Sequence, residues 1–422
     1  MRIVYLHQYF FTRSMVGIAG NRSYEFARRL VAMGHQVDMV TSYTYDQGHA
    51  HLDWFETEED GIRVHWLPVP YSNKMDFKKR VKAFFRFAIR ASRKAVEIEA
   101  DVVIATSGPL TIAVPGIFAS WYRNIPFVFE VRDLWPEGAI QLNVLTNPMA
   151  KWLARRLERF AYARSRHIVA LSPGMRDGIA GTGVSASKVT IIPNAADIDL
   201  FQPDADGSEV REKYGLNSYF TLAYFGTMGL ANGLNFVLDA AAELKAREVT
   251  DIRFLLHGDG MERPYLEKRA RDEGLDNVLF TGPTPKDEMA KFLAGVDVCM
   301  TIFKNAPVLQ TSSPNKMFDA LAAGKPVLTN MPGWLESIAV RDKTGVFIKP
   351  DDPIDFADKV IWMRDHPDAL REFGKNARRI AEERFSRDVL ARQLECVLLS
   401  TQFSNANSAV KKVESVGERD LA

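Results

Sequence analysis

Short apolar runs alternate with longer helical patterns along the first half of the chain. The runs that predict strands lie at residues 3–6, 37–41, 63–67, 102–105, 127–131, 167–171 and 190–192. Helical patterns fill most of the spaces between them, for example at 22–33 and 149–163. Because strands that alternate with helices pair in parallel, this rhythm predicts a parallel sheet with helices on both faces.

The rhythm breaks once and then begins again. Pro, Asp and Gly are concentrated at 193–197 and 202–207, which indicates a linker. New apolar runs follow at 220–225, 253–257, 278–281, 296–301, 326–328 and 346–348. We therefore predict an α/β fold of two doubly wound, Rossmann-like domains, residues 1–195 and 196–385, that face a cleft. We expect a closing helix at 386–400 and a disordered tail at 401–422, since that stretch is polar and lacks periodicity.

Composition and length narrow the class of protein. The chain has 422 residues, of which 46% are hydrophobic and 25% charged, as in a globular protein of two or three domains. Only two cysteines are present, which excludes a disulfide framework and a cysteine-based zinc cluster and fits a reducing cytosol. We find no signal peptide, no membrane-spanning run and no metal-ligand spacing among the histidines, so no metal or other cofactor is expected.

The net charge of +1 conceals an asymmetry. Residues 1–200 carry 25 Lys and Arg against 19 Asp and Glu, whereas the remainder carries 29 against 34. This difference in net charge between the two parts of the chain suggests two domains that bind different partners.

The segment 313–327 is the most informative part of the sequence. Lys316 and Asp319 lie three residues apart at the start of a predicted helix, which small residues and an apolar strand follow. A helix N-terminus favours phosphate, a lysine adds a cation, and a carboxylate one turn later can accept hydrogen bonds from a ribose. The pattern indicates a nucleotide-diphosphate pocket. The alternative is an ordinary strand–helix–strand unit with a solvated lysine.

Glycine pairs follow the first predicted strand of each domain. Gly17 and Gly20 precede one helix, and Gly226 begins a loop with Thr227 and Asn232. Such loops let the backbone approach a ligand, although the spacing is not that of a dinucleotide-binding motif. A simple flexible loop is the alternative.

Charged groups end two of the predicted strands. Glu130, Arg132 and Asp133 lie at the end of a buried strand and are candidates for acid–base work or for binding sugar hydroxyls. The alternative is a structural ion pair of Arg132 with either carboxylate. The loop 258–263 carries the candidates Gly258, Asp259 and Arg263, which could hold a base or phosphates, and the alternative is a tight turn capped by the aspartate.

Residues 75–95 form a basic helical pattern. The stretch 73–94 contains nine basic residues and one acid, Asp76. Two apolar side chains, Phe85 and Ile89, flank the basic stripe. This pattern favours contact with an anionic membrane surface over nucleic acid, and a solvated helix is the alternative. The candidate membrane residues are Lys78, Lys82, Phe85, Arg86, Ile89 and Arg90.

Taken together, the motifs resemble the retaining glycosyltransferases of family 4, which have the GT-B fold. The resemblance extends from residue 1 to about residue 400. The segment 131–137 is similar to a branch that makes bacterial O-antigen and capsule polysaccharide and includes amino-sugar transferases. The matching pieces are 17–25, 34–37, 192–201, 226–233, 257–260 and 314–326.

The resemblance implies a nucleotide-sugar donor on the C-terminal domain and an acceptor on the N-terminal domain. Lys316 would contact the diphosphate and Asp319 the ribose. The family's paired glutamates correspond here to Thr311 and Asp319, and its phosphate-loop cations to Thr227 and Asn232. Its frequent cleft histidine corresponds to Arg132. Arg263 is therefore a second candidate for meeting the phosphate charge.

The resulting hypothesis is retaining transfer of a sugar, an N-acetylated amino sugar, from a UDP-linked donor to a lipid-linked saccharide. It implies a peripheral protein at the inner face of the cytoplasmic membrane, without nucleic acid as a partner. Two alternatives stay open, a nucleotide-sugar epimerase of the same fold and a non-catalytic sugar-nucleotide-binding protein of a membrane assembly.

Overall fold

The computed structural model describes the chain except for residues 13–14, 16–21, 45–52, 71–74, 76, 142 and 418–422. The backbone alone is described at 77, 287 and 403–417. The chain forms two compact units. The N-terminal unit comprises most of residues 1–192 together with the chain from Leu390 onward, and the C-terminal unit comprises Pro193–Val389.

The N-terminal unit is built on an eight-stranded sheet with the order β3-β4-β2-β1-β5-β6-β7-β8. All neighbouring strands are parallel except β3 and β4. The strands are β1 (Arg2–Leu6), β2 (Gln36–Tyr43), β3 (Phe55–Glu59), β4 (Ile62–Pro68), β5 (Val102–Thr106), β6 (Phe127–Val131), β7 (His167–Ala170) and β8 (Val189–Ile191).

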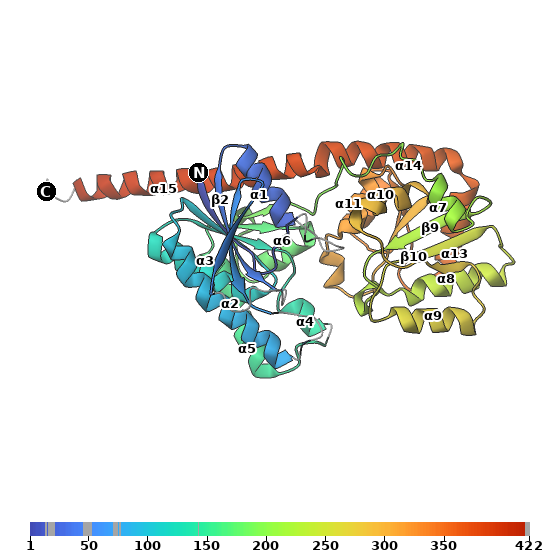
Figure 1. Cartoon of the computed structure of the whole chain (residues 1–422), viewed down its shortest axis with the longest axis horizontal. Coiled ribbons are helices and arrows are strands. Elements are labelled where there is room, and N and C mark those ends of the chain that lie inside the picture. Colours follow the sequence, from blue (N-terminus) through green and yellow to red (C-terminus); the bar gives the residue numbers. More distant parts are fainter. Residues whose placement is uncertain are drawn as a thin grey trace. The chain divides into compact units, whose positions relative to one another are not determined.

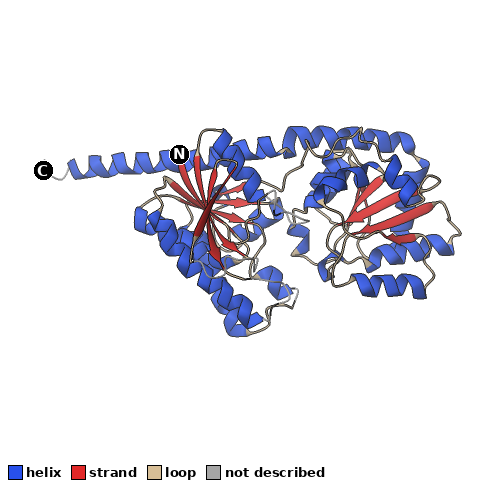
Figure 2. Ribbon diagram, viewed as in Figure 1, coloured by secondary structure: helices blue, strands red, loops and turns tan. Residues whose placement is uncertain are grey.

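Helices cover the faces of this sheet (Figures 1 and 2). They are α1 (Arg22–Ala32), α2 (Phe77–Glu97), α3 (Ala113–Arg123), α4 (Glu137–Gln141), α5 (Pro148–Arg164) and α6 (Pro173–Ala180). Apolar residues of α2, α3 and α5 share one core cluster with the strands, so these three helices lie on the same face. α3 packs beside both α2 and α5.

The C-terminal unit has a six-stranded sheet, entirely parallel, with the order β11-β10-β9-β12-β13-β14. Two core clusters cover it, one on each face. Its strands are β9 (Phe220–Phe225), β10 (Ile252–His257), β11 (Val278–Phe280), β12 (Val298–Thr301), β13 (Val327–Thr329) and β14 (Gly345–Phe347). Its helices are α7 (Ser208–Lys213), α8 (Asn235–Ala246), α9 (Arg263–Asp272), α10 (Lys286–Ala294), α11 (Asn315–Ala322), α12 (Trp334–Glu336), α13 (Pro353–Asp365) and α14 (Pro367–Ile380).

The predicted fold class, two Rossmann-like parallel sheets, is confirmed. One strand was missed. β3 pairs antiparallel with β4 at the edge of the first sheet, and its sequence, Phe-Glu-Thr-Glu-Glu, carries too many charges to form an apolar run. Edge strands tolerate such charges because one side of the strand faces water.

The last helix also differs from the prediction. α15 spans Arg387–Gly417, so regular structure continues past residue 400, where the sequence analysis expected a disordered tail. Residues 401–416 contain neither Gly nor Pro, and therefore nothing in the local sequence ends the helix before Gly417. From Leu390 onward α15 belongs to the N-terminal unit, where Glu395 accepts a hydrogen bond from His35 at 2.8 Å.

Candidate functional site

Two glycine loops pack against each other at the carboxyl ends of β9 and β10. A Cβ on Gly258 would lie 1.9 Å from the carbonyl oxygen of Gly226, and one on Gly260 would lie 2.3 Å from that of Met228. Both glycines have positive φ, +141° and +158°. Backbone hydrogen bonds join the loops, from Gly226 N to His257 O at 2.9 Å and from Met228 N to Asp259 O at 2.8 Å. Only glycine lets the two loops approach this closely, so the glycines determine the shape of the surface at the carboxyl ends of β9 and β10.

Lys316 lies beside the first of these loops, in the first turn of α11. Its Nζ is 3.6 Å from the ring centroid of Tyr224, and a Cβ on Gly226 would lie 3.7 Å from the same nitrogen. Among the described residues the ammonium has no hydrogen-bond or ion-pair partner. Burial lowers the pKa of Lys316 well below its usual value. A cation without a counter-ion, beside a glycine loop and a helix N-terminus, is arranged to receive an anion.

Asp319 lies one turn further along α11, beside a compact ionic group. Asp197 accepts hydrogen bonds from Arg387 at 2.8 Å and from Lys286 at 3.2 Å. Burial raises the pKa of Asp319 to about 6, against the opposing effect of Lys286 and Arg387 and with a further increase from Asp197. No described side chain donates to the Asp319 carboxylate, so it is available to a polyol.

The other predicted donor-side residues lie around the same edge, but their side chains are engaged locally. The Asn232 amide oxygen accepts from Gly229 N at 3.2 Å, and the hydroxyl of Thr311 donates to Val308 O at 2.7 Å. Thr227 holds the loop through its backbone, because its carbonyl accepts from the Tyr224 hydroxyl at 2.5 Å. These groups shape the loops.

The loop after β10 is similarly tied. Asp259 Oδ1 accepts from Gly260 N at 2.8 Å. Arg263 donates to Gly258 O at 3.2 Å and to Glu267 at 2.7 Å, so its guanidinium is shared between the loop and α9. His257, at the end of β10, is buried between Thr281 and Thr284, and burial lowers its pKa to about 4. Of the two predicted phosphate-binding cations, Lys316 is therefore without a partner among the described residues, whereas Arg263 is engaged.

In the N-terminal unit, Glu130 does not occupy the catalytic position expected for it. Its side chain is fully buried at the end of β6 and accepts from Arg22 Nε at 3.0 Å and Nη2 at 2.9 Å. The second carboxylate oxygen accepts from the Thr106 hydroxyl. Arg22 also donates to Ile192 O at 2.7 Å, so the pair joins α1, β6 and the end of the unit. Glu130 therefore forms a structural ion pair, and its partner in that pair is Arg22 and not Arg132.

Asp133 and Arg132 lie further out at the same strand end. Asp133 keeps exposed surface, yet desolvation by the surrounding chain raises its pKa, against the opposing effect of Arg132. Arg132 Nη1 lies 3.5 Å from His7 Nε2, and Ser23 lies 2.6 Å from His7 Nδ1. Burial and Arg132 lower the pKa of His7 well below its usual range, so the imidazole is neutral. The sequence analysis missed His7, although its place after β1 is a signal that could have found it.

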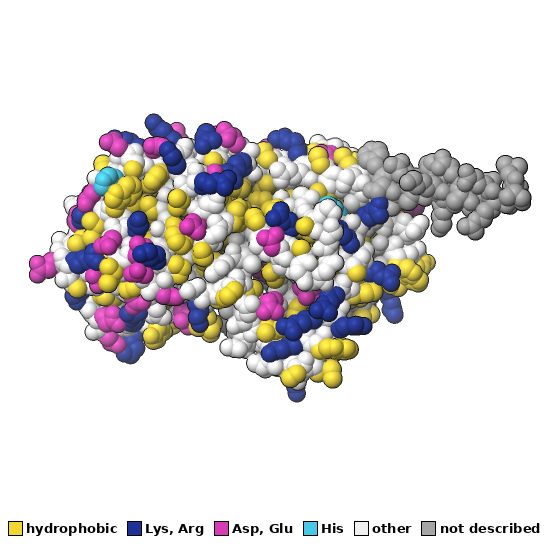
Figure 3. Space-filling view, turned by 180° about the vertical axis from the view of Figure 1, so that it is seen from behind, with side chains coloured by type: hydrophobic (Ala, Val, Ile, Leu, Met, Phe, Trp, Pro, Cys, Tyr) yellow, Lys and Arg dark blue, Asp and Glu magenta, His cyan; other side chains and the backbone are white. Residues whose placement is uncertain are grey.

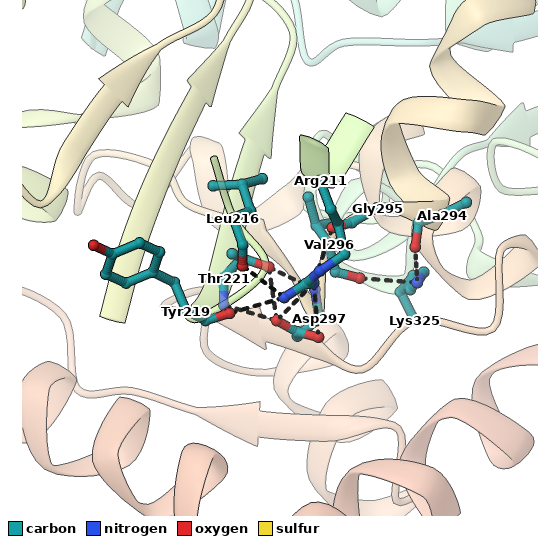
Figure 4. A network of polar contacts seen from close by, with 9 residues as sticks. All are labelled: Arg211, Leu216, Tyr219, Thr221, Ala294, Gly295, Val296, Asp297 and Lys325. Atoms are coloured by element: carbon teal, nitrogen blue, oxygen red, sulfur yellow. Dashed lines mark hydrogen bonds and ion pairs between the residues drawn. The ribbon is translucent and has the colours of Figure 1, made fainter. Parts of the chain in front are cut away.

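The amino ends of the C-terminal strands carry a different kind of polar network (Figure 4). Asp297 accepts from Thr221 N at 2.8 Å and from its hydroxyl at 2.7 Å, and Arg211 reaches the same carboxylate at 3.4 Å. Lys325 donates to the carbonyls of Ala294 at 3.0 Å and Val296 at 2.8 Å. The functional groups of this network satisfy one another, which is the pattern of a structural element.

The predicted membrane residues lie on α2. Lys78, Lys82, Phe85, Arg86 and Ile89 are exposed, whereas Arg90 pairs with Asp53. The predicted glycines Gly17 and Gly20 lie outside the described residues. No cluster of three or more His, Cys, Asp or Glu side chains suited to a metal occurs in the described part of the chain. Among the described helices, none combines the length and hydropathy that a bilayer crossing requires.

The protein has two Rossmann-like units, and in the second one a lysine and two glycine loops lie at the carboxyl ends of the strands. This architecture is that of a two-domain protein of the GT-B type. Residues 19–195 match the family described as glycosyl transferase 4-like domain, and residues 219–366 match glycosyl transferases group 1. Together these matches span most of the chain. The protein is therefore a glycosyltransferase of the GT-B type that carries these two domains.

Several known proteins are similar to this chain over much of their length. Alpha-D-kanosaminyltransferase of Streptomyces kanamyceticus is 24% identical over 64% of this chain and 69% of its own. D-inositol 3-phosphate glycosyltransferase 2 of Catenulispora acidiphila is 28% identical, over 84% and 83%. The putative colanic acid biosynthesis glycosyl transferase WcaI of Escherichia coli is 24% identical, over 74% and 79%.

A solved structure, Anabaena HepE in complex with UDP-glucose, has the same fold. It superposes with a TM-score of 0.69 at 18% identity and covers 95% of this chain and all of that one.

Proposed function

We propose that this protein transfers a sugar, an N-acetylated amino sugar, from a UDP-sugar to a lipid-linked saccharide in cell-surface polysaccharide synthesis. The names of the kanosaminyl and colanic acid relatives support the amino sugar and the polysaccharide, and the UDP-glucose complex of HepE supports the base. The inositol phosphate relative shows that other acceptors occur among similar chains.

The observation that carries the proposal is the Lys316 ammonium beside the Gly226 loop, which has no hydrogen-bond or ion-pair partner in the described part of the chain. In sugar transfer the nucleoside diphosphate leaves, and negative charge develops on its phosphates. Lys316, the backbone N–H groups of the loop and the N-terminus of α11 would stabilise that charge without a metal ion. Asp319 would accept hydrogen bonds from the ribose, which fixes the donor relative to the lysine.

The acceptor is proposed to bind the N-terminal unit, near Asp133. This carboxyl is exposed beside Arg132, so it can orient an acceptor hydroxyl or stabilise an oxocarbenium-like sugar. The family resemblance implies retention of the anomeric configuration, with departure and attack on the same face of the sugar. Glu130 has no part in this step because Arg22 and Thr106 occupy it.

A lipid-linked acceptor requires the protein to work at a membrane surface. We propose the inner face of the cytoplasmic membrane, with the exposed basic residues of α2 against anionic lipid. Nucleic acid is not proposed as a partner.

The first test is thermal stabilisation by UDP-, GDP-, ADP- and dTDP-sugars, with and without EDTA. Stabilisation by UDP-sugars that survives EDTA is expected, and it should be absent in Lys316→Ala. Product analysis then separates the alternatives. Transfer to an added acceptor with a retained anomer supports the proposal. A changed donor sugar without acceptor would mean an epimerase, and binding without any turnover would mean a non-catalytic protein.

A further inference from the structure

The outer face of α3 is aromatic. Its exposed apolar residues are Val114, Phe118, Trp121 and Tyr122. They recur at spacings of three and four, which places them on one face of the helix. The Phe118 ring lies 6.0 Å from Trp121 and 6.3 Å from Tyr122, and the two outer rings are 70% and 64% exposed. A contiguous exposed patch of this kind indicates an interaction surface.

α5 adds a second apolar stripe bordered by arginines. Its exposed apolar residues are Met149, Trp152, Leu153 and Phe160. Arg156 lies 5.7 Å from the Trp152 ring centroid and Arg164 lies 5.2 Å from that of Phe160. Such cation–π pairs keep a charged group close to an aromatic surface without neutralising it.

The charge on this helix has one sign. The one acid of α5, Glu158, is buried, where it accepts from the Tyr162 hydroxyl at 3.2 Å, and burial raises its pKa to about 7. The exposed cations of α5 include Arg155, Arg156, Arg159 and Arg164. Arg155 also reaches Glu137 of α4 at 3.4 Å. The outward face of α5 therefore presents cations and apolar groups, and no carboxylate of its own.

A basic groove separates the C-terminal ends of the two helices. It has a volume of about 590 Å³, and its lining includes Trp121, Arg164, Arg166 and Lys188. α3 packs against α2 on its other side, so the aromatic face adjoins the helix that carries Phe85 and Ile89. In the space-filling view, Lys and Arg side chains gather beside hydrophobic ones over the helices of this unit, at the lower right (Figure 3).

We propose that the outer faces of α3 and α5, with the groove between them, form a docking surface for an anionic lipid bilayer. Trp121, Tyr122 and Trp152 insert at the depth of the headgroups, and the arginines of α5 bind lipid phosphates. Trp and Tyr are typical of the membrane interface because their rings are apolar and carry a polar tip. A surface with one sign of charge complements phosphates spread over a plane. This inference deepens the proposed membrane attachment, which it extends beyond α2.

The test is flotation with vesicles of phosphatidylcholine alone and of phosphatidylcholine mixed with phosphatidylglycerol. Trp121→Ser with Trp152→Ser should weaken binding to the mixed vesicles by about tenfold or more. Both side chains are exposed, so folding should be unaffected. Tyr265→Ser on α9, which removes a comparably exposed ring from the C-terminal unit, is the matched control and should bind like wild type.

A second readout uses the tryptophans themselves. Brominated lipids should quench wild-type fluorescence more than that of the double variant. Equal vesicle binding by the double variant overturns the proposal, whatever charge reversal at Lys78, Lys82 and Arg86 of α2 does. A wild-type dimer in light scattering that the double variant dissociates, without vesicle binding, would identify a protein interface instead. Flotation needs neither donor nor acceptor, so failure of the proposed transfer leaves its result interpretable.

Discussion

Lys316 lies in the first turn of α11 and Lys325 lies just after the end of that helix, and the two ammonium groups have different contacts. Burial lowers the pKa of both. Lys325 donates to two carbonyl oxygens, from Ala294 and Val296, whereas Lys316 has the ring of Tyr224 and no hydrogen-bond acceptor among the described residues. Because Lys316 is only partly buried and its ammonium has no acceptor among the described residues, it is open to an anion supplied by a ligand. We propose that the same residue type serves structure at Lys325 and donor binding at Lys316.

The largest difference should appear when the ammonium of Lys316 is removed. Lys316→Met is expected to lower sugar transfer by about 100-fold or more, since it removes one cation from the stabilisation of the leaving diphosphate. Its stability should not fall, because the methionine stem packs on Tyr224 and no internal hydrogen bond is lost. Steady-state transfer from the stabilising UDP-sugar and thermal unfolding are measured on the same preparation.

Two outcomes would contradict this prediction. Near-normal transfer in Lys316→Met would remove the lysine from the donor site. A marked loss of stability would mean that the ammonium has a structural partner after all, and the contrast with Lys325 would then disappear.

The sequence predicted the features of this comparison that depend on local pattern. Alternation of apolar runs located both sheets, and the local pattern identified the glycine loop at Gly226 and the lysine at the start of a helix, Lys316, as separate candidates. What it missed depends on contacts between distant residues. Glu130 pairs with Arg22, 108 positions away, and His7 meets Arg132 across 125 positions, so no local spacing could reveal either pair. The sequence around Lys325 gave no sign of its structural role. Its acceptors are carbonyl oxygens at the end of α10 and in the loop after it, which lie far away in the sequence.

Removing the other lysine should produce the opposite result. Lys325→Met leaves the carbonyls of Ala294 and Val296 without their donor, so the free energy of unfolding should decrease by about 1 to 3 kcal/mol. The affinity for the UDP-sugar should be unchanged, because these contacts lie at the amino ends of the strands. Urea unfolding and calorimetric titration test the two halves of the prediction. Weakened donor binding at unchanged stability would assign Lys325 to the site.

A proton balance sharpens the contrast further. The free Lys316 amine has a lowered pKa, and a bound diphosphate should raise that pKa, so donor binding should take up protons at pH values between the two pKa values. Affinity should therefore fall as the pH rises. Calorimetric titration with the nucleotide sugar in buffers of different ionisation enthalpy measures this uptake. In Lys316→Arg the guanidinium stays charged throughout, and no uptake is expected. Equal uptake in both proteins would assign the proton to another group.

The smallest expected effect concerns Asp319, the carboxylate on α11 that lies between the two lysines in the sequence. The pKa of Asp319 is raised from 3.8 to about 6 in the folded chain, so the folded state holds this proton more tightly than the unfolded one. Its contribution to stability therefore decreases between about pH 4 and pH 6, and the deficit persists at higher pH. Asp319→Asn should raise the unfolding temperature above pH 6, with no gain below about pH 4.

Asp297→Asn is the control for this carboxylate. Asp297 accepts hydrogen bonds from Thr221 and Arg211, so its replacement should lower the stability of the protein. A stability gain of Asp319→Asn that is the same at all pH values would show that packing, and not the buried charge, separates the two aspartates. A loss at neutral pH would show that the Asp319 carboxylate has a donor inside the chain, which would leave it less free for a ribose.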